Sequence, residues 1–336
     1  MIQLLRYMLF PFAVLYGIVV RVRHLAYDKR VLKSVQFEIP TICVGNVSVG
    51  GTGKTPMVEY LIRNLQENYK IGVVSRGYKR KTKGLVMADT TSTVYDLGDE
   101  PFQFWKKYPK ISLVVNADRA SGISHLLDLP QPPEVILLDD AFQHRKVEAK
   151  INVVLTAYGN LFTDDWLLPT GNLRDVVSRV QQADVIVVTK CPPHISQQER
   201  KKIATQIRQK EHQSVVFATI AYGEKVISAN QSVYLEEFIK LPFLLVTGIA
   251  NPIPLLNFLN KCGATFEHLN FADHHHFSET EIEKLKQSPR VLTTEKDYVR
   301  LESRLSDIFY LPIETVFIDK TEEATFWKIL DLQRKS

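Results

Sequence analysis

Residues 45–56 read GNVSVGGTGKTP, and they lie between a short β-branched run and a longer helical pattern. Glycines let the backbone bend so that several N–H groups face the oxygens of one phosphate, and a helix that starts just beyond adds the positive end of its dipole. Strand, glycine-rich turn, GKT tripeptide and helix together predict a phosphate-binding P-loop. Ser48 stands where the common GxxxxGK[ST] pattern has its first glycine, and we expect Gly50 and Gly51 to supply the flexibility instead.

The predicted P-loop assigns roles toward a nucleoside triphosphate and Mg²⁺. Lys54 is expected to bridge the terminal phosphates, and the Thr55 hydroxyl is expected to bind the metal. The hydrophobic run 135–138 ends in Asp139 and Asp140, and a carboxylate pair that follows a P-loop favours Mg²⁺ binding or the orientation of a bound water. The separate roles of the two aspartates stay open. The predicted nucleotide-binding residues are Ser48, Val49, Gly50, Gly51, Thr52, Gly53, Lys54 and Thr55, and the predicted metal ligands are Thr55, Asp139 and Asp140.

Short β-branched runs alternate with longer helical patterns after Pro40. This alternation predicts an α/β fold with a mostly parallel sheet of the P-loop NTPase type, covered by helices. Its strands are expected at 41–45, 71–75, 111–115, 134–139, 151–155, 185–189 and 214–218, with helices over 56–67 and 196–210. A second, smaller α/β unit is indicated by runs near 243–247, 265–269, 290–294 and 308–317. Its best-marked helix begins at Ser278, because Glu281 three residues later completes a capping-box pattern.

Weak periodicity and mixed polarity mark 222–240 as a boundary between these units. The sequence therefore predicts four parts: a membrane-associated helix at 1–30, a P-loop core at 36–221, a linker region at 222–240 and a smaller α/β domain at 241–336.

The amino terminus departs from the pattern of a soluble protein. No residue from Tyr7 to Val20 is charged, and basic residues stand before and after this run. The run is shorter than the roughly 20 apolar residues that span a bilayer, and no small-residue cleavage site follows it. We expect a helix that lies in or dips into the membrane surface with its basic flank on anionic headgroups, and a buried core helix is the alternative. Whether it spans or lies on the bilayer stays open.

The composition is that of a globular protein and excludes disordered or fibrous classes. The 336 residues are 45% hydrophobic, and 42 Lys and Arg against 37 Asp and Glu give a formal charge of +5. This mild excess suits a phosphorylated ligand or an anionic membrane and does not require nucleic acid. Cys43, Cys191 and Cys262 stand far apart without a CxxC pair, which argues against a disulfide framework or a zinc site and favours a reducing cytoplasm.

A P-loop alone does not define a reaction, because GTPases, ATPases, metallochaperone NTPases and kinases share it. Guanine-reading sites carry an NKxD sequence, and the matching segment here begins at Thr189 and has Pro192 at the position of the aspartate. A GTPase is therefore disfavoured.

Further motifs occur in the order seen in tetraacyldisaccharide 4'-kinases, and the chain resembles this family from its apolar amino terminus to Asp297. These motifs are SRGY at 75–78, GDEP at 98–101, DDAFQH at 139–144, LPTGNLR at 168–174, TGIANP at 247–252, DH at 273–274 and TEKD at 294–297. Several are short, but their joint order with the VGGTGKTP loop is highly specific.

The resemblance implies transfer of the γ-phosphoryl group of ATP to the 4'-hydroxyl of a tetraacylated glucosamine disaccharide 1-phosphate, which gives lipid IVA in lipid A biosynthesis. It implies ATP and Mg²⁺ as cofactors and a place at the cytoplasmic face of the bacterial inner membrane. It also implies two α/β domains that face each other across a cleft, with the amino-terminal helix against the bilayer. Neither nucleic acid nor a protein partner is implied.

By motif match, Asp99 is expected to be the base that accepts the proton of the sugar hydroxyl, with His274 as its partner from the second domain. A carboxylate that orients and deprotonates the acceptor is sufficient help for phosphoryl transfer. The expected contacts to substrate or nucleotide are Arg76, Gln143, His144 and Arg174. The family usually has Arg-Glu where this chain has Arg174-Asp175, so any metal or ligand contact there would be made by a shorter carboxylate arm.

Two other classes are alternatives. A soluble P-loop metallochaperone or assembly NTPase could use the histidine run 274–276 for a transition metal, although consecutive histidines cannot easily share one ion. A membrane-docked structural ATPase would use hydrolysis to drive a conformational change. ATP consumption that depends strictly on a lipid disaccharide acceptor would separate a kinase from both.

Overall fold

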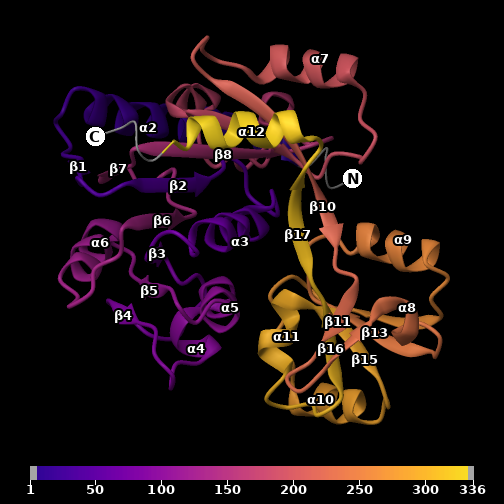
Figure 1. Cartoon of the computed structure of the whole chain (residues 1–336). Coiled ribbons are helices and arrows are strands. Elements are labelled where there is room, and N and C mark those ends of the chain that lie inside the picture. Colours follow the sequence, from indigo (N-terminus) through magenta and orange to yellow (C-terminus); the bar gives the residue numbers. More distant parts are fainter. Residues whose placement is uncertain (1–5, 332–336) are drawn as a thin grey trace.

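Two β-sheets, each covered by helices, form the larger and smaller parts of the molecule in the computed structural model, which describes residues 6–331 (Figure 1). The larger part is built on a nine-stranded sheet and the smaller part on a six-stranded sheet. Two strands, β10 (Ser214–Tyr222) and β17 (Ile313–Phe317), run from one part toward the other (Figure 1). A separate pair, β1 (Val35–Gln36) and β7 (Val147–Glu148), forms a short parallel ladder.

The nine-stranded sheet has the order β17-β10-β9-β8-β2-β6-β3-β5-β4. Its strands are β2 (Thr41–Gly45), β3 (Ile71–Ser75), β4 (Val86–Met87), β5 (Ser112–Val115), β6 (Val135–Asp139), β8 (Ile151–Ala157), β9 (Val185–Thr189), β10 (Ser214–Tyr222) and β17 (Ile313–Phe317). Neighbours from β10 to β5 are parallel, and only the outer strands β17 and β4 are antiparallel. Every residue of β2, β3, β6 and β9 is buried, as expected when helices cover both faces of a parallel sheet.

Helices cover the two faces of this sheet in separate layers. The helices of the larger part are α3 (Lys54–Leu65), α4 (Val94–Leu97), α5 (Asp99–Lys107), α6 (Arg119–Leu127), α7 (Gln197–Ile207) and α12 (Lys320–Ile329), with 3-10 turns at Phe162–Asp164 and Val177–Gln182. Apolar side chains of α3, α5 and α12 pack in one core layer, and those of α6 and α7 pack in the other. The predicted α/β fold with a mostly parallel sheet is therefore confirmed.

The smaller sheet has the order β12-β11-β16-β15-β13-β14. Its strands are β11 (Lys225–Ile227), β12 (Ser232–Tyr234), β13 (Phe243–Thr247), β14 (Phe266–Asn270), β15 (Val291–Thr294) and β16 (Ile308–Leu311), and its helices are α8 (Leu235–Phe238), α9 (Ile253–Lys261), α10 (Glu279–Lys286) and α11 (Glu295–Leu301). The four strands from β16 to β14 are parallel. Ser278 and Glu281 form the predicted capping box at the start of α10.

The carboxyl-terminal part of the predicted division is wrong. The expected strand over 308–317 is two strands, because Pro312 has no N–H with which to continue a ladder. After this proline, β17 pairs antiparallel with β10, so the chain returns to the larger sheet and ends there in α12. The segment from β17 onward, which was predicted as the end of the small domain at 241–336, therefore belongs to the larger part. Residues 332–336 lie outside the described range.

The predicted linker over 222–240 also differs from the structure. This segment forms β11, β12 and α8, which belong to the smaller sheet and its helices. Both strands are three residues long, and β12 is an edge strand with an exposed or half-exposed surface throughout. Strands this short carry almost no periodicity, which explains why the sequence suggested a linker.

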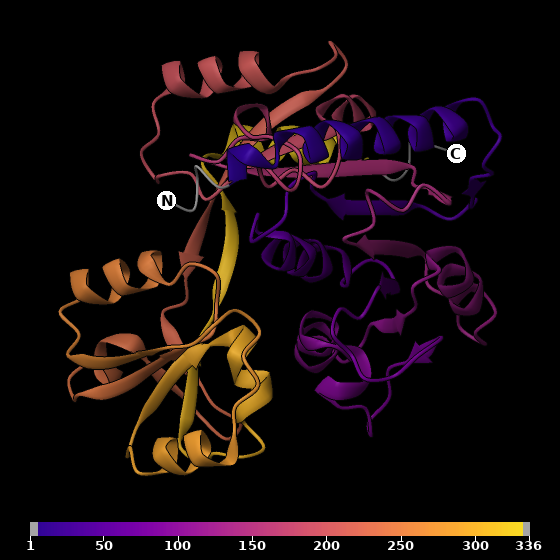
Figure 2. The same cartoon turned by 180° about the vertical axis from the view of Figure 1, so that it is seen from behind.

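Helix α2 (Phe10–Asp28) lies along the back of the larger part (Figure 2). Its buried residues, Ala13, Gly17, Val20 and His24, recur every three or four positions and form one stripe against the protein. Its opposite face is apolar and open, with large exposed side chains at positions such as Phe12. Over residues 6–331 we find no helix with the length and hydropathy that crossing a bilayer requires. Residues 1–5 of the predicted helix at 1–30 lie outside the described range.

Candidate active site

The phosphate loop connects β2 to α3, in the context that the sequence predicted. Its backbone takes positive φ at Gly50 (96°) and at Gly53 (85°), a region that residues with a side chain rarely adopt. Gly50 is thus one of the two glycines expected to compensate for Ser48. Ser48 itself forms an isolated β-bridge with Leu173, and the next residue, Val49, donates its N–H to the Asn172 carbonyl at 2.7 Å. The loop is therefore braced from outside by segment 172–173.

Polar bonds inside the loop hold its shape. The buried Asn46 amide donates to the Thr52 hydroxyl at 2.7 Å, and its oxygen lies 3.4 Å from the Lys54 ammonium. The Thr189 hydroxyl, at the end of β9, donates to the Thr52 carbonyl at 2.7 Å. Lys54 also lies 3.7 Å from a carboxylate oxygen of Asp140. These bonds fix the loop against the end of β9 and hold the Lys54 ammonium between Asn46 and Asp140.

The two predicted metal-binding aspartates lie in different electrostatic environments. Asp139 ends β6 and accepts a hydrogen bond of 2.7 Å from the Ser75 hydroxyl. Burial raises the pKa of Asp139 to about 6, and the charge of Asp140 adds to the rise. Burial alone would raise the pKa of Asp140 as well, but Lys54 and Arg174 outweigh it and hold this pKa below its usual value. The surrounding cations therefore compensate the charge of Asp139 less than that of Asp140.

Arg174 connects the acidic pair with the phosphate loop. Its guanidinium pairs with both carboxylate oxygens of Asp140 and also donates to the Asn46 side chain, so it ties the acidic pair to the phosphate loop. The following residue, Asp175, points elsewhere: it is buried and bonds at 2.6 Å to His24 of α2. The shorter carboxylate that departs from the family pattern thus anchors the amino-terminal helix.

The other predicted contacts surround the same centre. Gln143 donates its side-chain N–H to the Asn46 carbonyl, which places it beside the loop. Burial and the charge of Arg119 lower the pKa of His144 to about 4, so this imidazole is neutral at physiological pH. Arg76 is exposed and lies one residue beyond β3 and Ser75. The structure therefore gathers all three at the carboxyl ends of the parallel strands, where ligands of open α/β sheets bind.

Asp99 and His274 meet although 175 residues separate them. Asp99 is the first residue of α5, and His274 lies beyond β14 with a φ of 60°. Their Oδ2 and Nδ1 atoms are 2.6 Å apart, and Arg300 of α11 pairs with both oxygens of the carboxylate, with its Nε 2.8 Å from Oδ1. Burial would raise the pKa of Asp99, but the bonds from His274 and Arg300 prevail and hold it far below its usual range.

Lys296 fixes the tautomer of His274. Its ammonium lies 2.9 Å from Nε2, and an ammonium can only donate, so Nε2 must present its lone pair. The ring proton is then on Nδ1 and is donated to Asp99. The Arg300 guanidinium also comes within 3.0 Å of Nδ1, but its bond to Asp99 is the shorter one. Lys296 has two further acceptors within reach, Asp273 at 3.0 Å and Glu100 at 3.5 Å.

Helix α5 carries Asp99, and helix α11 carries Lys296 and Arg300. The two helices contact each other across the boundary between the two parts. Two more ion pairs join the same region: Lys107 pairs with Glu295, the first residue of α11, and Lys106 pairs with Glu302, the residue after its end. Asp99, His274 and Arg300 line a small cleft of about 50 Å³ there. The charge of Glu100 contributes to the raised pKa of Asp139, so the acid–histidine pair and the phosphate site lie within electrostatic reach of each other.

The neighbouring histidines are used differently. His275 bonds to Glu281 at 3.0 Å and stacks on Phe271, so it supports the start of α10.

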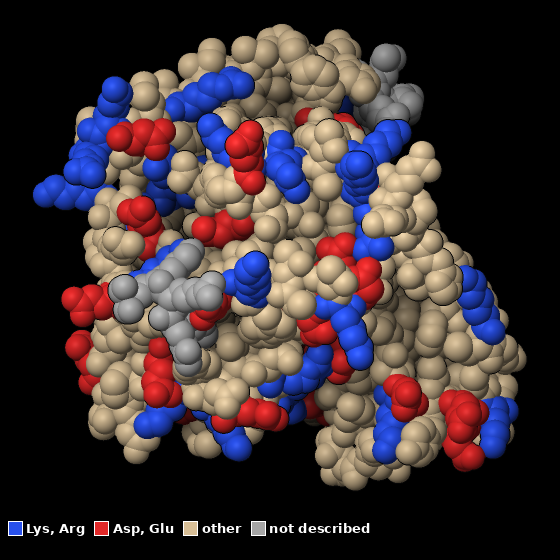
Figure 3. Space-filling view, turned by 45° about the horizontal axis from the view of Figure 1, so that its top comes forward, with Lys and Arg blue, Asp and Glu red and all other residues tan. Residues whose placement is uncertain are grey.

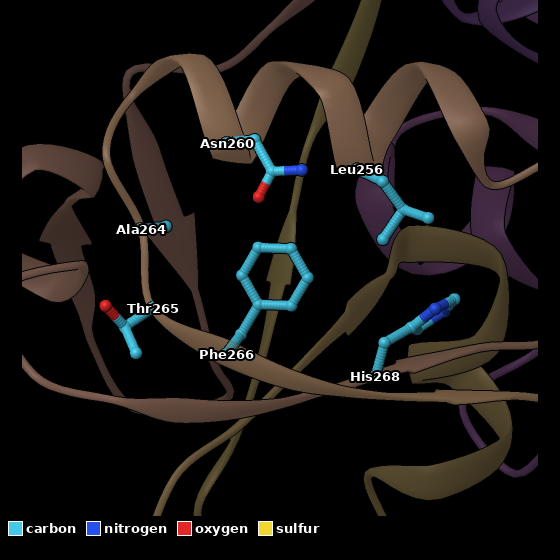
Figure 4. Close-up of a pocket in the computed structure, with 6 residues that line it drawn as sticks. All are labelled: Leu256, Asn260, Ala264, Thr265, Phe266 and His268. Atoms are coloured by element: carbon cyan, nitrogen blue, oxygen red, sulfur yellow. The ribbon is translucent and has the colours of Figure 1, made fainter.

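A larger hollow of about 430 Å³ lies outside the site, between α9 and β14 (Figure 4). Figure 4 shows Phe266 and His268 of the strand under Leu256 and Asn260 of the helix. Charged side chains of both signs are mixed over the face shown in Figure 3.

Sequence reasoning missed several residues of the site. Arg300 and Lys296 act on the acid–histidine pair, while Asn46 and Ser75 act on the phosphate loop and on Asp139. One signal was available: the lysine and the arginine are four residues apart on a helix, so they face the same way. Nothing in the sequence indicated that this face meets α5.

The sheet, the loop and the acidic pair define an α/β nucleotide-binding protein of the P-loop NTPase type. Comparison with known proteins gives the family: the family model described as Tetraacyldisaccharide-1-P 4'-kinase matches residues 5–332. The chain is 47% identical over 326 residues to the tetraacyldisaccharide 4'-kinase of Flavobacterium psychrophilum, covering 95% of this chain and 94% of the relative. The relative of the same description from Flavobacterium johnsoniae is 45% identical over 322 residues, with 94% of each chain covered. The chain belongs to the tetraacyldisaccharide-1-P 4'-kinase family.

A solved structure agrees with this assignment. The crystal structure described as the "apo" form of LpxK from Aquifex aeolicus in complex with ATP superposes with a TM-score of 0.78 at 28% sequence identity. The match covers 97% of this chain and 99% of that one. The likeness therefore includes both sheets and the connection between them.

Proposed function

We propose that this protein transfers the γ-phosphoryl group of ATP to the 4'-hydroxyl of a tetraacylated glucosamine disaccharide 1-phosphate, which forms lipid IVA in lipid A biosynthesis. We place it on the cytoplasmic face of the bacterial inner membrane. The observation that carries the proposal is the bond between Asp99 and His274 within electrostatic reach of the phosphate site, in a chain that matches the family over 5–332. A P-loop binds the donor, and an acid–histidine pair is what an alcohol acceptor requires.

ATP is the donor that the proposal assigns to residues 48–55. The backbone of the loop and the start of α3 would bind the phosphates, and Lys54 would neutralise charge on the migrating group. Thr55, Asp139 and Asp140 would hold Mg²⁺, which supplies charge neutralisation to the phosphates when bound. The donor set fits this ion because all its atoms are oxygens and because burial and the charge of Asp140 raise the pKa of Asp139, so a cation bound there would favour its charged form.

We assign His274, rather than Asp99, as the base that accepts the proton of the acceptor hydroxyl. The sequence led us to expect Asp99 as the base, yet both of its oxygens are held by Arg300 and its pKa is strongly lowered, so it is a weak proton acceptor. Nε2 of His274 carries the free lone pair once Lys296 turns to Asp273 or Glu100. Asp99 then orients the imidazole and stabilises its charged form.

Helix α2 is assigned to the membrane surface that carries the lipid. Its outward face exposes a row of large apolar side chains at Phe12, Leu15 and Val19, while its inner stripe is fixed to the larger part. The Tyr16 hydroxyl donates to the Arg174 carbonyl at 2.7 Å, so the helix lies directly behind the residue that ties Asp140 to the phosphate loop. Such a helix would hold the reaction centre close to the headgroup of a lipid acceptor.

The test is incubation of the purified protein with labelled ATP and the disaccharide monophosphate in detergent micelles. We expect label in a bisphosphorylated lipid and ATP consumption only when the lipid is present. ATP hydrolysis at the same rate without lipid would instead support the structural ATPase. Hydrolysis that responds to a transition metal and not to lipid would support the metallochaperone.

A further inference from the structure

Lys190 lies over the phosphate loop without having been assigned to it. It is the first residue after β9, and its φ of 58° is in the left-handed region, which is uncommon for lysine. This turn directs the side chain back over the loop: the ammonium lies 3.6 Å from the position that a side-chain carbon on Gly51 would take. The preceding residue, Thr189, already bonds to the Thr52 carbonyl at 2.7 Å. The end of β9 is therefore part of the wall of the loop.

The ammonium of Lys190 lacks a counter-charge in the protein. Among residues 6–331, no hydrogen bond or ion pair involves it. Lys190 as a whole is exposed, yet burial around its ammonium lowers its pKa, and no carboxylate acts in the other direction. A cation that is partly removed from water without a partner is unfavourable, and an anion beside it removes that cost. The nearest place built for an anion is the phosphate loop.

The order of strands indicates which part of a nucleotide Lys190 would meet. The loop follows β2, the aspartate pair follows β6 on one side of it, and Lys190 follows β9 on the other side, beyond β8. Lys54 points to the β6 side, where it lies 3.7 Å from Asp140. The terminal phosphate is therefore expected on the side of β6, and the remainder of the nucleotide on the side of β9.

We infer that Lys190 is a nucleotide-binding residue whose ammonium contacts the phosphate chain of ATP on the part that leaves as ADP. The inference rests on the proposed ATP-dependent function and adds a second lysine to it. Lys54 contacts the migrating phosphoryl group, and Lys190 contacts the phosphates that remain in ADP. Because the second contact is the same before and after transfer, it contributes to binding and leaves the chemical step unchanged.

The experiment compares three variants of the full-length protein. Lys190→Gln removes the charge and keeps the side-chain length, and Lys190→Arg keeps the charge. Lys190→Gly removes the side chain and suits the left-handed backbone. Binding of fluorescently labelled ADP, and its displacement by ADP and ATP, is measured in detergent without lipid, and kcat and KM for ATP are measured with lipid.

We expect Lys190→Gln and Lys190→Gly to weaken ADP and ATP binding equally, by about 10- to 100-fold, the range for loss of a hydrogen bond to a charged group. KM for ATP should rise while kcat stays within about threefold, and Lys190→Arg should retain most of the affinity. The inference is overturned if Lys190→Gln binds ADP within about twofold of the parent, if only ATP binding weakens, or if kcat falls with unchanged affinity. Weak binding by Lys190→Gly alone would show that the residue acts through the backbone, which also overturns it.

These outcomes are separate from a failure of the proposed function. A parent protein that forms no bisphosphorylated lipid contradicts the kinase itself, whatever the variants do. A parent that forms the lipid while Lys190→Gln binds ADP normally contradicts only the role of Lys190.

Discussion

Replacing Asp139 and Asp140 by asparagine, one at a time, should change the stability of the metal-free protein in opposite directions. The two residues are adjacent, but burial raises the pKa of Asp139 to about 6 while Lys54 and Arg174 keep that of Asp140 below its usual value. Asparagine keeps the size of the side chain and an oxygen for the Ser75 hydroxyl, which now donates to Asp139 at 2.7 Å. The substitution therefore removes charge with little change in packing.

The magnitude follows from the linkage between protonation and folding. A carboxyl group whose folded-state pKa is above its unfolded value takes up protons on folding, so stability falls as pH rises from the lower value to the higher one. For Asp139 this window runs from 3.8 to about 6. A difference of about two units corresponds to about 3 kcal/mol, which is the upper limit of the gain expected for Asp139→Asn at neutral pH. Asp140 has the opposite sign: its charged form stabilises the fold above the unfolded pKa, so Asp140→Asn should be destabilising.

The assay is thermal unfolding in the presence of a chelator and without nucleotide, near pH 7.5 and again near pH 4. Asp139→Asn should unfold several degrees above the parent near pH 7.5 and lose most of that advantage near pH 4, where Asp139 is protonated in the folded parent. It should nevertheless be inactive, since the charge that destabilises the fold is the charge that would hold Mg²⁺. A lower unfolding temperature for Asp139→Asn near pH 7.5, or shifts of the same sign for both variants, would refute the reasoning.

Three further predictions concern the reaction. Lys54→Ala should remove most activity while the protein stays folded, because its charge is needed on the migrating phosphoryl group; lipid turnover near the parent rate would show that the loop is misassigned. Asp99→Ala and His274→Ala should each lower kcat by about 10²- to 10⁴-fold with nearly unchanged nucleotide affinity, and the double variant should be little worse than the poorer single one. Fully multiplicative losses would mean that the two residues act independently. Deletion of residues 1–24 should raise KM for lipid in mixed micelles far more than KM for ATP, and equal membrane recovery of both forms would contradict the anchor.

Local patterns were sufficient to predict most elements of the fold. The strand before the phosphate loop, the helix after it and the capping box at Ser278 depend on neighbours within a few residues, and all three are present. The return of β17 to the larger sheet was not predictable in this way. Its partner, β10, lies about ninety residues earlier in the chain, and no periodicity states which of two sheets a strand will join.

The same limit applies to the site. The residues of the phosphate loop and the acidic pair follow strand ends, so their type and position were visible in the sequence. The position of Arg300 against Asp99 depends on how α11 of one part meets α5 of the other, which is a long-range contact. The sequence named both residues of the pair, but it could not show this contact, which is the reason for proposing His274 rather than Asp99 as the base.

The way in which the smaller part is attached has a consequence for how such a protein could arise and be rebuilt. The chain leaves the larger part after β10 and returns to it at β17. These two passages lie side by side, because the Gly223 N–H donates to the Pro312 carbonyl at 2.9 Å. The segments on either side of residues 224–311 are therefore paired with each other up to their last residues. They form a β-hairpin in which a folded unit replaces the turn. A short turn in place of that unit should leave β10 and β17 paired and α12 in contact with them. The protein is thus a P-loop domain with a smaller α/β unit inserted in one hairpin, and we expect that the corresponding units of relatives could be exchanged at the same two residues.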